Sequence, residues 1–405
     1  MMDTAESILT KNKGIGPGFN MMRHVLSLVI LAHHCRVAVA GLFNGAPFVK
    51  KLDEPGMAVF VLKNPTAVAY DKAAGLSGLA FGSLHAGEII QEVLRPGLFA
   101  LVGMFFALSG FLVTGSAMRN SEIKSFVANR ILRIVPALSV EVTLCALLLG
   151  PLLTQLPLSE YFGSYQFYRY FGNIVGHVTF ELPGLFVTNP WPEMVNANLW
   201  TLPWELWCYV FAFVPLLTRA ISYEFNKSRW ISLAIIAVLV AEVIAALIDP
   251  HTYNVRQDST RFAGWYIVMM FFFGMLFRLN ANYISLNWVF FVVAAGCYAV
   301  MMWFNILLPL AGIFLTYCTV YVGMMKFPRF DRLFTQDLSY GIYLYGFPLS
   351  QATIYLFMTY FGRSHLSFPV IFPIVLVLTL SFAMMSWNFI EKPTLRLRKL
   401  WQKPV

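Results

Sequence analysis

The residues best suited to chemistry lie in the first long apolar stretch, residues 20–43, which Arg23, His33 and His34 interrupt. Charged and polar side chains are costly inside a membrane, so those that occur there mark functional sites by default. Arg23 and His34 stand 11 positions apart, which is about three helical turns and about 16 Å of rise. Eleven steps of about 100° return to within about 20° of the start, so both lie on one stripe, whereas His33 lies about 80° away. The pattern favours a site with Arg23 near the membrane edge and His34 deep inside; the alternative is a histidine that only packs between helices.

A second basic pair, Arg130 and Arg133, opens the apolar range 132–155. Residues three positions apart lie on one face of a helix. Two guanidinium groups on one face suit bidentate binding of phosphate groups. The alternative is that both residues only anchor the helix at the cytoplasmic surface, where basic residues gather.

A carboxylate stands near the start of the apolar range 200–220, in the segment NLWTLPWELWCY (198–209). Glu205 must pair, take up a proton or face water, because an isolated carboxylate is costly in a membrane. It could orient an imidazole, as carboxylates do in catalytic triads, or bind sugar hydroxyls. Trp200 is one of three tryptophans here, whose simpler role is an aromatic belt at the membrane surface.

Ser109 lies in the string FFALSGFLVTG (105–115) of another apolar range. Small residues there let neighbouring helices approach closely, and spacing alone makes packing at least as good an interpretation as catalysis. As a hypothesis, the Ser109 hydroxyl supports a developing oxyanion. Two further carboxylates in apolar ranges, Glu141 and Glu242, are interpreted as structural.

The composition places all these residues in a membrane protein. Of 405 residues, 58% are hydrophobic and 12% are charged, against about 25% charged in soluble domains. Five cysteines lie in apolar blocks without CxxC spacing, and no HExxH occurs, so no disulfide frame and no metal site are predicted. Apolar blocks of about 20 residues match the thickness of a bilayer core. They predict an all-α, polytopic bundle of about ten spans, near 23–43, 96–118, 132–155, 200–220, 229–248, 262–279, 284–303, 305–325, 338–361 and 367–391.

The distribution of basic residues predicts the orientation. With the N-terminus inside, the inner segments carry most of the lysines and arginines, as the positive-inside rule expects. Both termini are therefore predicted to be cytoplasmic, with a loose tail over 1–19 and a basic tail over 396–405. Residues 20–395 form one predicted domain.

Two long loops are predicted on the outer side, over 44–95 and 156–199. Within the second, residues 177–190 are apolar but too short to cross a bilayer. This stretch is predicted to be re-entrant or to lie at the interface.

Several strings together resemble the acyltransferase-3 family of integral-membrane O-acyltransferases, which includes carbohydrate and O-antigen O-acetyltransferases. The resemblance covers about residues 20–395 and rests on these strings in order: Arg23-x10-His34, FFALSGFL (105–112), Arg130-x-x-Arg133, WTLPWE (200–205), SYGIYLYGFP (339–348) and EKP (391–393). Tyr343 lies in the fifth string and is predicted to support the site. Gly346 stands where the family usually has a histidine, so no role is transferred to that position.

The resemblance implies an acyl-CoA donor, typically acetyl-CoA, on the cytoplasmic side, and a carbohydrate hydroxyl as acceptor. Candidate acceptors are an O-antigen, an exopolysaccharide or another cell-surface polysaccharide, a lipid-linked sugar or a small glycoside. Arg130 and Arg133 are expected to hold the donor phosphates, with Arg23 further along the same path. No bound cofactor, metal or nucleic-acid partner is expected, and the expected location is the bacterial inner membrane, among its lipids.

In the predicted mechanism His34 is the general base on the acceptor hydroxyl, a role that suits an imidazole near neutral pH. Glu205 is the second catalytic candidate, and Ser109, Trp200 and Tyr343 support the site. A rival class is a membrane transporter of a lipid or sugar conjugate, which would also place histidine and arginine inside the membrane. A third is a non-catalytic assembly subunit, which should tolerate the loss of His34.

Overall fold

The computed structural model describes residues 4–40, 49–51, 59–61, 86–119, 123–221, 226–248, 259–304, 306–333 and 336–398. Within these ranges the regular structure is helical, apart from a short antiparallel ribbon of β1 (Val49–Lys51) and β2 (Val59–Val61), with Val49 opposite Val61. The predicted all-α class is confirmed for the body of the protein. Most of the predicted outer loop 44–95 lies outside the described residues.

Each of the ten predicted apolar ranges contains a long helix. These helices are α2 (Phe19–Ala40), α4 (Ala86–Arg119), α5 (Ile123–Leu144), α9 (Leu202–Ile221), α10 (Asn226–Ile248), α11 (Ser259–Leu279), α12 (Trp288–Phe304), α13 (Leu308–Met324), α15 (Ser339–Phe361) and α16 (Phe368–Ser386). Of the described segments, four are long and apolar enough to cross a membrane: Pro96–Met118, Lys124–Leu153, Arg229–Ile248 and Phe368–Arg396. Membrane insertion is therefore supported, while the number of spans and the side of the termini stay predictions.

Shorter elements connect and extend these helices. α5 continues through a π-helical turn, Cys145–Leu149, into α6 (Gly150–Leu153), and α16 continues through a second π-helical turn, Trp387–Glu391, into α17 (Lys392–Arg396). The remaining short elements are α1 (Ala5–Lys11), α7 (Leu158–Gly163), α8 (Tyr165–Tyr170), α14 (Pro328–Leu333) and three 3-10 turns, Phe171–Val175, Ala197–Thr201 and Arg363–His365.

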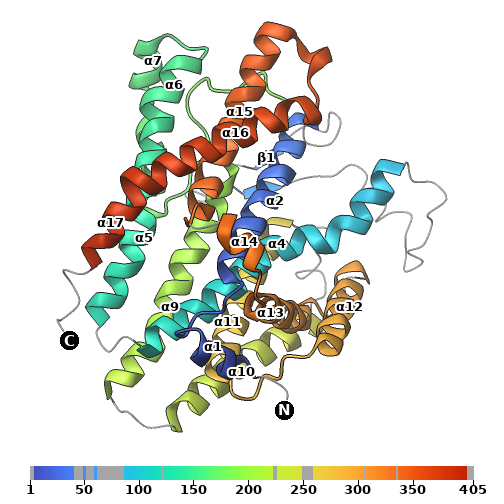
Figure 1. Cartoon of the computed structure of the whole chain (residues 1–405). Coiled ribbons are helices and arrows are strands. Elements are labelled where there is room, and N and C mark those ends of the chain that lie inside the picture. Colours follow the sequence, from blue (N-terminus) through green and yellow to red (C-terminus); the bar gives the residue numbers. More distant parts are fainter. Residues whose placement is uncertain are drawn as a thin grey trace.

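Two groups of helices meet along α2 (Figure 1). α15 and α16 pack on α2 and on each other, in the upper part of the view. α4, α11, α12 and α13 form a second packed group in the lower part, and α2 also contacts α4 and α13. α2 therefore contacts both groups, and the buried residues of α2 lie between them.

The N-terminal tail differs from its predicted character, and the position of residues 177–190 relative to the membrane stays a prediction. The N-terminal tail is not loose over residues 4–19, because Ala5 and Leu9 of α1 are buried and the Ala5 N–H donates to Ile284 O at 3.0 Å. Glu6 also pairs with Arg278 at 2.6 Å. Residues 177–190 form irregular chain, and Phe180, Leu182, Leu185 and Phe186 within them are buried in an apolar cluster with α5 and α15.

Glycines set the closest helix crossing, that of α4 and α11. A Cβ atom added to Gly110 would lie 2.0 Å from the Phe271 carbonyl oxygen, and one added to Gly274 would lie 2.0 Å from the Ala107 carbonyl oxygen. Each helix therefore presses its backbone into the other at a position without a side chain. Packing accounts for Gly110 in the FFALSGFL string, as the alternative interpretation held.

This crossing predicts the effect of adding one methyl group. We expect Gly110→Ala to lower stability by about 1–3 kcal/mol or more, because backbone cannot move aside as a side chain can. Gly97→Ala in the same helix is the matched control, since a Cβ atom there would meet nothing within 4 Å. Thermal unfolding of both variants in the same detergent measures the difference. Equal stability of the two variants would contradict the interpretation.

Candidate functional site

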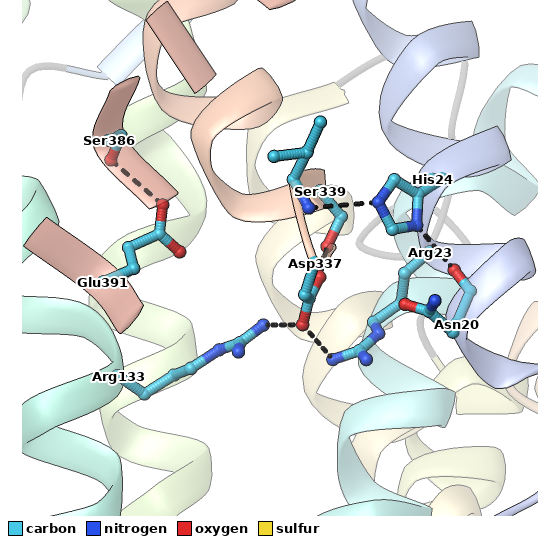
Figure 2. A network of polar contacts seen from close by, with 9 residues as sticks. Asn20, Arg23, His24, Arg133, Asp337, Ser339, Ser386 and Glu391 are labelled. Atoms are coloured by element: carbon cyan, nitrogen blue, oxygen red, sulfur yellow. Dashed lines mark hydrogen bonds and ion pairs between the residues drawn. The ribbon is translucent and has the colours of Figure 1, made fainter. Parts of the chain in front are cut away.

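Two predicted arginines meet on one carboxylate that joins three helices. Arg133 of α5 donates from Nη2 to Asp337 Oδ2 at 2.7 Å, and Arg23 Nη1 of α2 lies 3.2 Å from the same oxygen. Asp337 lies two residues before the first residue of α15, and its side chain is 13% exposed. Figure 2 shows the two guanidinium groups approaching this carboxylate from opposite sides. Together they form a compact cationic centre around one anion.

The start of α15 is held in place by hydrogen bonds on both sides of Asp337. The Ser339 hydroxyl donates to Asp337 Oδ1 at 2.7 Å. The Leu338 N–H donates to His24 Nε2 at 3.0 Å, and His24 Nδ1 lies 2.8 Å from Asn20 O. Because Nε2 accepts, Nδ1 carries the proton and donates to Asn20 O. His24 thus has a structural role, and it fixes the turn of α2 that carries Arg23 (Figure 2).

The electrostatics of Asp337 follow from this pairing. Burial by itself would raise the pKa of Asp337, but the guanidinium groups of Arg133 and Arg23 outweigh it and lower the pKa below its usual value. Asp337 is therefore ionised near neutral pH. Each arginine can offer its remaining N–H groups to a second anion.

Arg130 and Glu205 form the adjoining part of this centre. The Arg130 guanidinium lies over the rings of Phe126 and Tyr209, at 5.6 and 5.8 Å from their centroids. The Tyr209 hydroxyl donates to Glu205 Oε1, and Arg133 and Arg130 are the charges that act on Glu205. Of the two roles predicted for Glu205, the geometry places it with a tyrosine and guanidinium groups rather than against an imidazole. Ser109 also lies against Tyr209.

Glu391 adds a third acidic group beside Arg133. It lies in the π-helical turn at the end of α16, and it accepts a hydrogen bond from the Ser386 hydroxyl at 3.0 Å. The opposite charge that acts on it is Arg133 (Figure 2). From the sequence, the EKP string suggested only the end of a helix.

His34 lies in a different, uncharged part of the site. Its ring meets the edge of Phe347 at 5.8 Å between centroids, and the Asn198 side chain faces it. Within the described residues, the enclosed Nδ1 atom of His34 has no hydrogen-bond partner. His33 lies beside it, 5.8 Å away between centroids, and has Arg36 as its neighbouring charge. The two histidines therefore occupy different environments, as their helical phase predicts.

Asn198 and Tyr343 join the His34 region to α15. The Asn198 side-chain amide donates to Tyr343 O at 2.5 Å, and the Tyr343 hydroxyl donates to Asn198 O at 2.8 Å. Thr201 Oγ1 is 2.7 Å from the Tyr343 hydroxyl. Trp200, in the same 3-10 turn, packs between the two largest apolar clusters. These hydrogen bonds hold the turn against α15.

The predicted residues fall into two connected groups. Arg23, Arg130, Arg133, Glu205 and Ser109 surround the cationic centre, while His34, Tyr343 and Trp200 lie together near Asn198. Glu205 links them, since it lies one helical turn after Thr201 and is the charge that acts on Tyr343. Arg130 and Arg133 both act on Glu205, whereas the ion pairs with Asp337 are made by Arg133 and Arg23.

Sequence reasoning missed Asp337 and Asn198. Asp337 stands two residues before the SYGIYLYGFP string, and Asn198 begins NLWTLPWE. Each position lies in or beside a segment that the sequence analysis names, and this proximity is the signal that could have indicated a role for both residues. Gly346 lies at a close contact, because a Cβ atom there would come within 2.6 Å of Leu31 Cδ1. The chain thus uses this position to bring α15 close to α2.

Comparisons with known proteins identify the family of the chain. The acyltransferase-3 family model, an acyltransferase domain, matches residues 18–387. The chain is similar to nodulation protein 10 of Rhizobium leguminosarum bv. viciae, with 28% identity over 357 residues, 79% of this chain and 89% of that protein. It is also similar to an O-acetyl transferase of Shigella phage Sf6, with 28% identity over 305 residues, 71% of this chain and 82% of that protein. No solved structure matches the chain.

The shared carboxylate predicts a pH-dependent contribution to stability. A lowered pKa in the folded protein stabilises the fold above the pKa of the unfolded state, about 3.9, and the contribution is lost as pH falls through the folded pKa. We expect Asp337→Asn to cost about 3 kcal/mol near pH 7, because two guanidinium groups lose their partner. The difference from wild type should narrow below about pH 4. Thermal unfolding in detergent from pH 7 to 3 measures the stability of both proteins. A difference in stability that does not change with pH would contradict the ionised state of Asp337.

Proposed function

Since the chain belongs to the acyltransferase-3 family and is an enzyme that transfers acyl groups, we propose that it moves an acyl group, typically acetyl, from acyl-CoA to a carbohydrate hydroxyl. The observation that carries the proposal is the division of one site into two parts. A cationic centre around Asp337 adjoins an uncharged region that holds a half-buried histidine, His34. The first suits an anionic donor, and the second suits proton transfer.

The donor end of the proposal rests on the arginines. Acyl-CoA carries phosphate groups, which guanidinium groups bind in bidentate fashion. Arg23 and Arg133 already converge on one carboxylate oxygen, and Arg130 has an enclosed Nε atom without a hydrogen-bond partner in the described part of the chain. These side chains supply N–H groups toward a second anion. By the positive-inside argument, this end faces the cytoplasm.

The acyl-transfer step is assigned to His34. The acceptor hydroxyl attacks the thioester carbonyl carbon while His34 takes the hydroxyl proton, and a new C–O bond forms. The C–S bond then breaks, which leaves the ester and the thiolate of CoA. The proton passes from His34 to this thiolate. A neutral imidazole can accept and return a proton in this way. Ser109 lies against Tyr209 in the cationic part of the site, so its role at the oxyanion stays a hypothesis.

The acceptor is proposed to be a cell-surface polysaccharide, an O-antigen or a lipid-linked sugar. The chain's similarity to a phage O-acetyl transferase supports hydroxyl acylation. A bacterial inner membrane would bring cytoplasmic acyl-CoA to one end of the site, while the acceptor enters from the outer side. The segment 156–199 would cover that entrance.

One assay separates this proposal from the transporter alternative. Purified protein in lipid nanodiscs is given acetyl-CoA with and without a carbohydrate acceptor, and free CoA is measured. We expect CoA release that depends on the acceptor, together with acetylated product by mass spectrometry. Transport of the sugar in sealed vesicles without CoA release would overturn the proposal.

The helical phase predicts different effects for the two histidines. We expect His34→Ala to lower acyl transfer by about 100- to 10,000-fold, because the general base is lost. His33→Ala, which lies toward Arg36, should retain measurable transfer. Both variants should accumulate in the membrane at wild-type levels, which immunoblotting checks. Equal loss of activity in the two variants would refute the assignment.

The cationic centre predicts weaker donor binding when Arg133 is removed. Each charge-assisted phosphate contact contributes about 1.5–3 kcal/mol, so Arg133→Ala should weaken acyl-CoA binding about 10-fold or more. Arg133→Lys should rescue only part of it, because an ammonium group cannot bind phosphate in bidentate fashion. Lys124→Ala, an exposed basic residue of the same helix, is the matched control. Calorimetric titration with acyl-CoA measures the affinity; an unchanged affinity would leave Arg133 as an anchor only.

A further inference from the structure

Two enclosed polar atoms of opposite character lie at the His34 site without partners. Within the described residues, neither His34 Nδ1 nor Asn198 Oδ1 has a hydrogen-bond partner. Asn198 is also the side chain whose hydrogen-bonding group faces the His34 ring. An imidazole ring nitrogen that carries a proton can donate a hydrogen bond, whereas an amide oxygen can only accept a hydrogen bond. Because unpartnered buried polar atoms are costly, these two atoms are each other's natural partners.

The other bonds of Asn198 fix which of its side-chain atoms is turned toward the ring. Its Nδ2 group donates to Tyr343 O at 2.5 Å, so its Oδ1 atom is the one left over. The Asn198 backbone is held as well, because its carbonyl accepts from the Tyr343 hydroxyl at 2.8 Å and its N–H donates to Asn196 Oδ1 at 3.1 Å. An acceptor held this firmly can select one tautomer of an imidazole.

A buried support stands behind this asparagine. Asn196 is fully buried, and its Nδ2 group donates to Glu141 Oε1 at 2.9 Å and to Leu344 O at 3.0 Å. Glu141 is also fully buried and accepts from the Cys145 thiol at 3.2 Å, where α5 passes into its π-helical turn. Glu141 and Asn196 together thus link α5, the turn with Asn198 and α15.

We propose that Asn198 is the positioning residue of His34, and that Glu141 and Asn196 support it. The Nδ1–H group of His34 donates a hydrogen bond to Asn198 Oδ1, which leaves the lone pair of Nε2 for the acceptor hydroxyl. The His34 side chain is half-buried, but its Nδ1 atom is enclosed, so the exposed part of the side chain excludes Nδ1. Glu205, the candidate from sequence for orienting an imidazole, is bonded to Tyr209 instead. This inference rests on the proposed function, because it assigns His34 as the base.

The test compares Asn198→Ala with Asn198→Asp in the acceptor-dependent assay. Loss of the orienting acceptor should lower kcat roughly 10- to 100-fold in Asn198→Ala. KM for acyl-CoA should stay within about 2-fold of wild type, because the arginines of the donor end are untouched. Asn198→Asp keeps the acceptor oxygen and adds negative charge, which stabilises an imidazolium. Its activity should therefore exceed that of Asn198→Ala, and the acidic limb of its pH–kcat profile should move up by about one pH unit.

Asn173→Ala is the matched control. Asn173 is a fully buried asparagine that also fastens irregular chain, since its Nδ2 group donates to Tyr170 O and Thr179 O at 2.8 and 2.9 Å. Its removal should lower the unfolding temperature as Asn198→Ala does, and the pH profile should not move. Glu141→Ala should lower kcat, because Asn196 loses the carboxylate that holds it and Asn198 is then held less firmly. Glu141→Gln keeps an oxygen acceptor for Asn196 and should retain most of the wild-type kcat.

The outcomes separate this inference from the proposed function. Wild-type kcat in Asn198→Ala, or an unmoved acidic limb in Asn198→Asp, overturns the role of Asn198 while His34→Ala is still inactive. An active His34→Ala variant, or the absence of acyl transfer by the wild type, overturns the proposed function itself. A kcat loss in Asn198→Ala that Asn173→Ala reproduces at equal stability would show a packing role only.

Discussion

The arrangement of the site depends on one carboxylate oxygen that two guanidinium groups share. Asp337 joins Arg23 of α2 to Arg133 of α5 at the start of α15, and an ionised carboxylate with so little exposure is stable only with such partners. His24 adds a directional bond to Leu338, so α2 and α15 are fixed in register. Phe347, further along α15, then meets the ring of His34.

A second constraint comes from the turn that precedes α9. The 3-10 turn Ala197–Thr201 carries Asn198 and Trp200, and it lies where the two largest apolar clusters meet. Irregular chain at this depth needs partners for its polar groups, because lipid offers none. Tyr343 and Asn196 supply them. The hydrogen bonds that satisfy this turn also aim a side chain at His34.

Charge is distributed unevenly within the bundle. The guanidinium groups and the ionised Asp337 gather at one end, while the surroundings of His34 are amide, hydroxyl and aromatic groups. The first environment offers guanidinium N–H groups to an anion, and the second surrounds an imidazole with uncharged groups. The proposed transfer from an anionic acyl carrier to a neutral hydroxyl would use both environments.

The sequence by itself determined the helical class, the ten apolar ranges and the assignment to a family, because hydropathy and short motifs are properties of neighbouring residues. Helical phase also separated His34 from His33, since both lie on one helix. The tertiary structure alone decided that Arg133 pairs with Arg23 through Asp337, that Glu205 faces Tyr209, and that Asn198 faces His34. Asp337 lies 204 positions from Arg133 in the chain. No local pattern relates such residues, and only the packing of α15 against α2 and α5 brings them together.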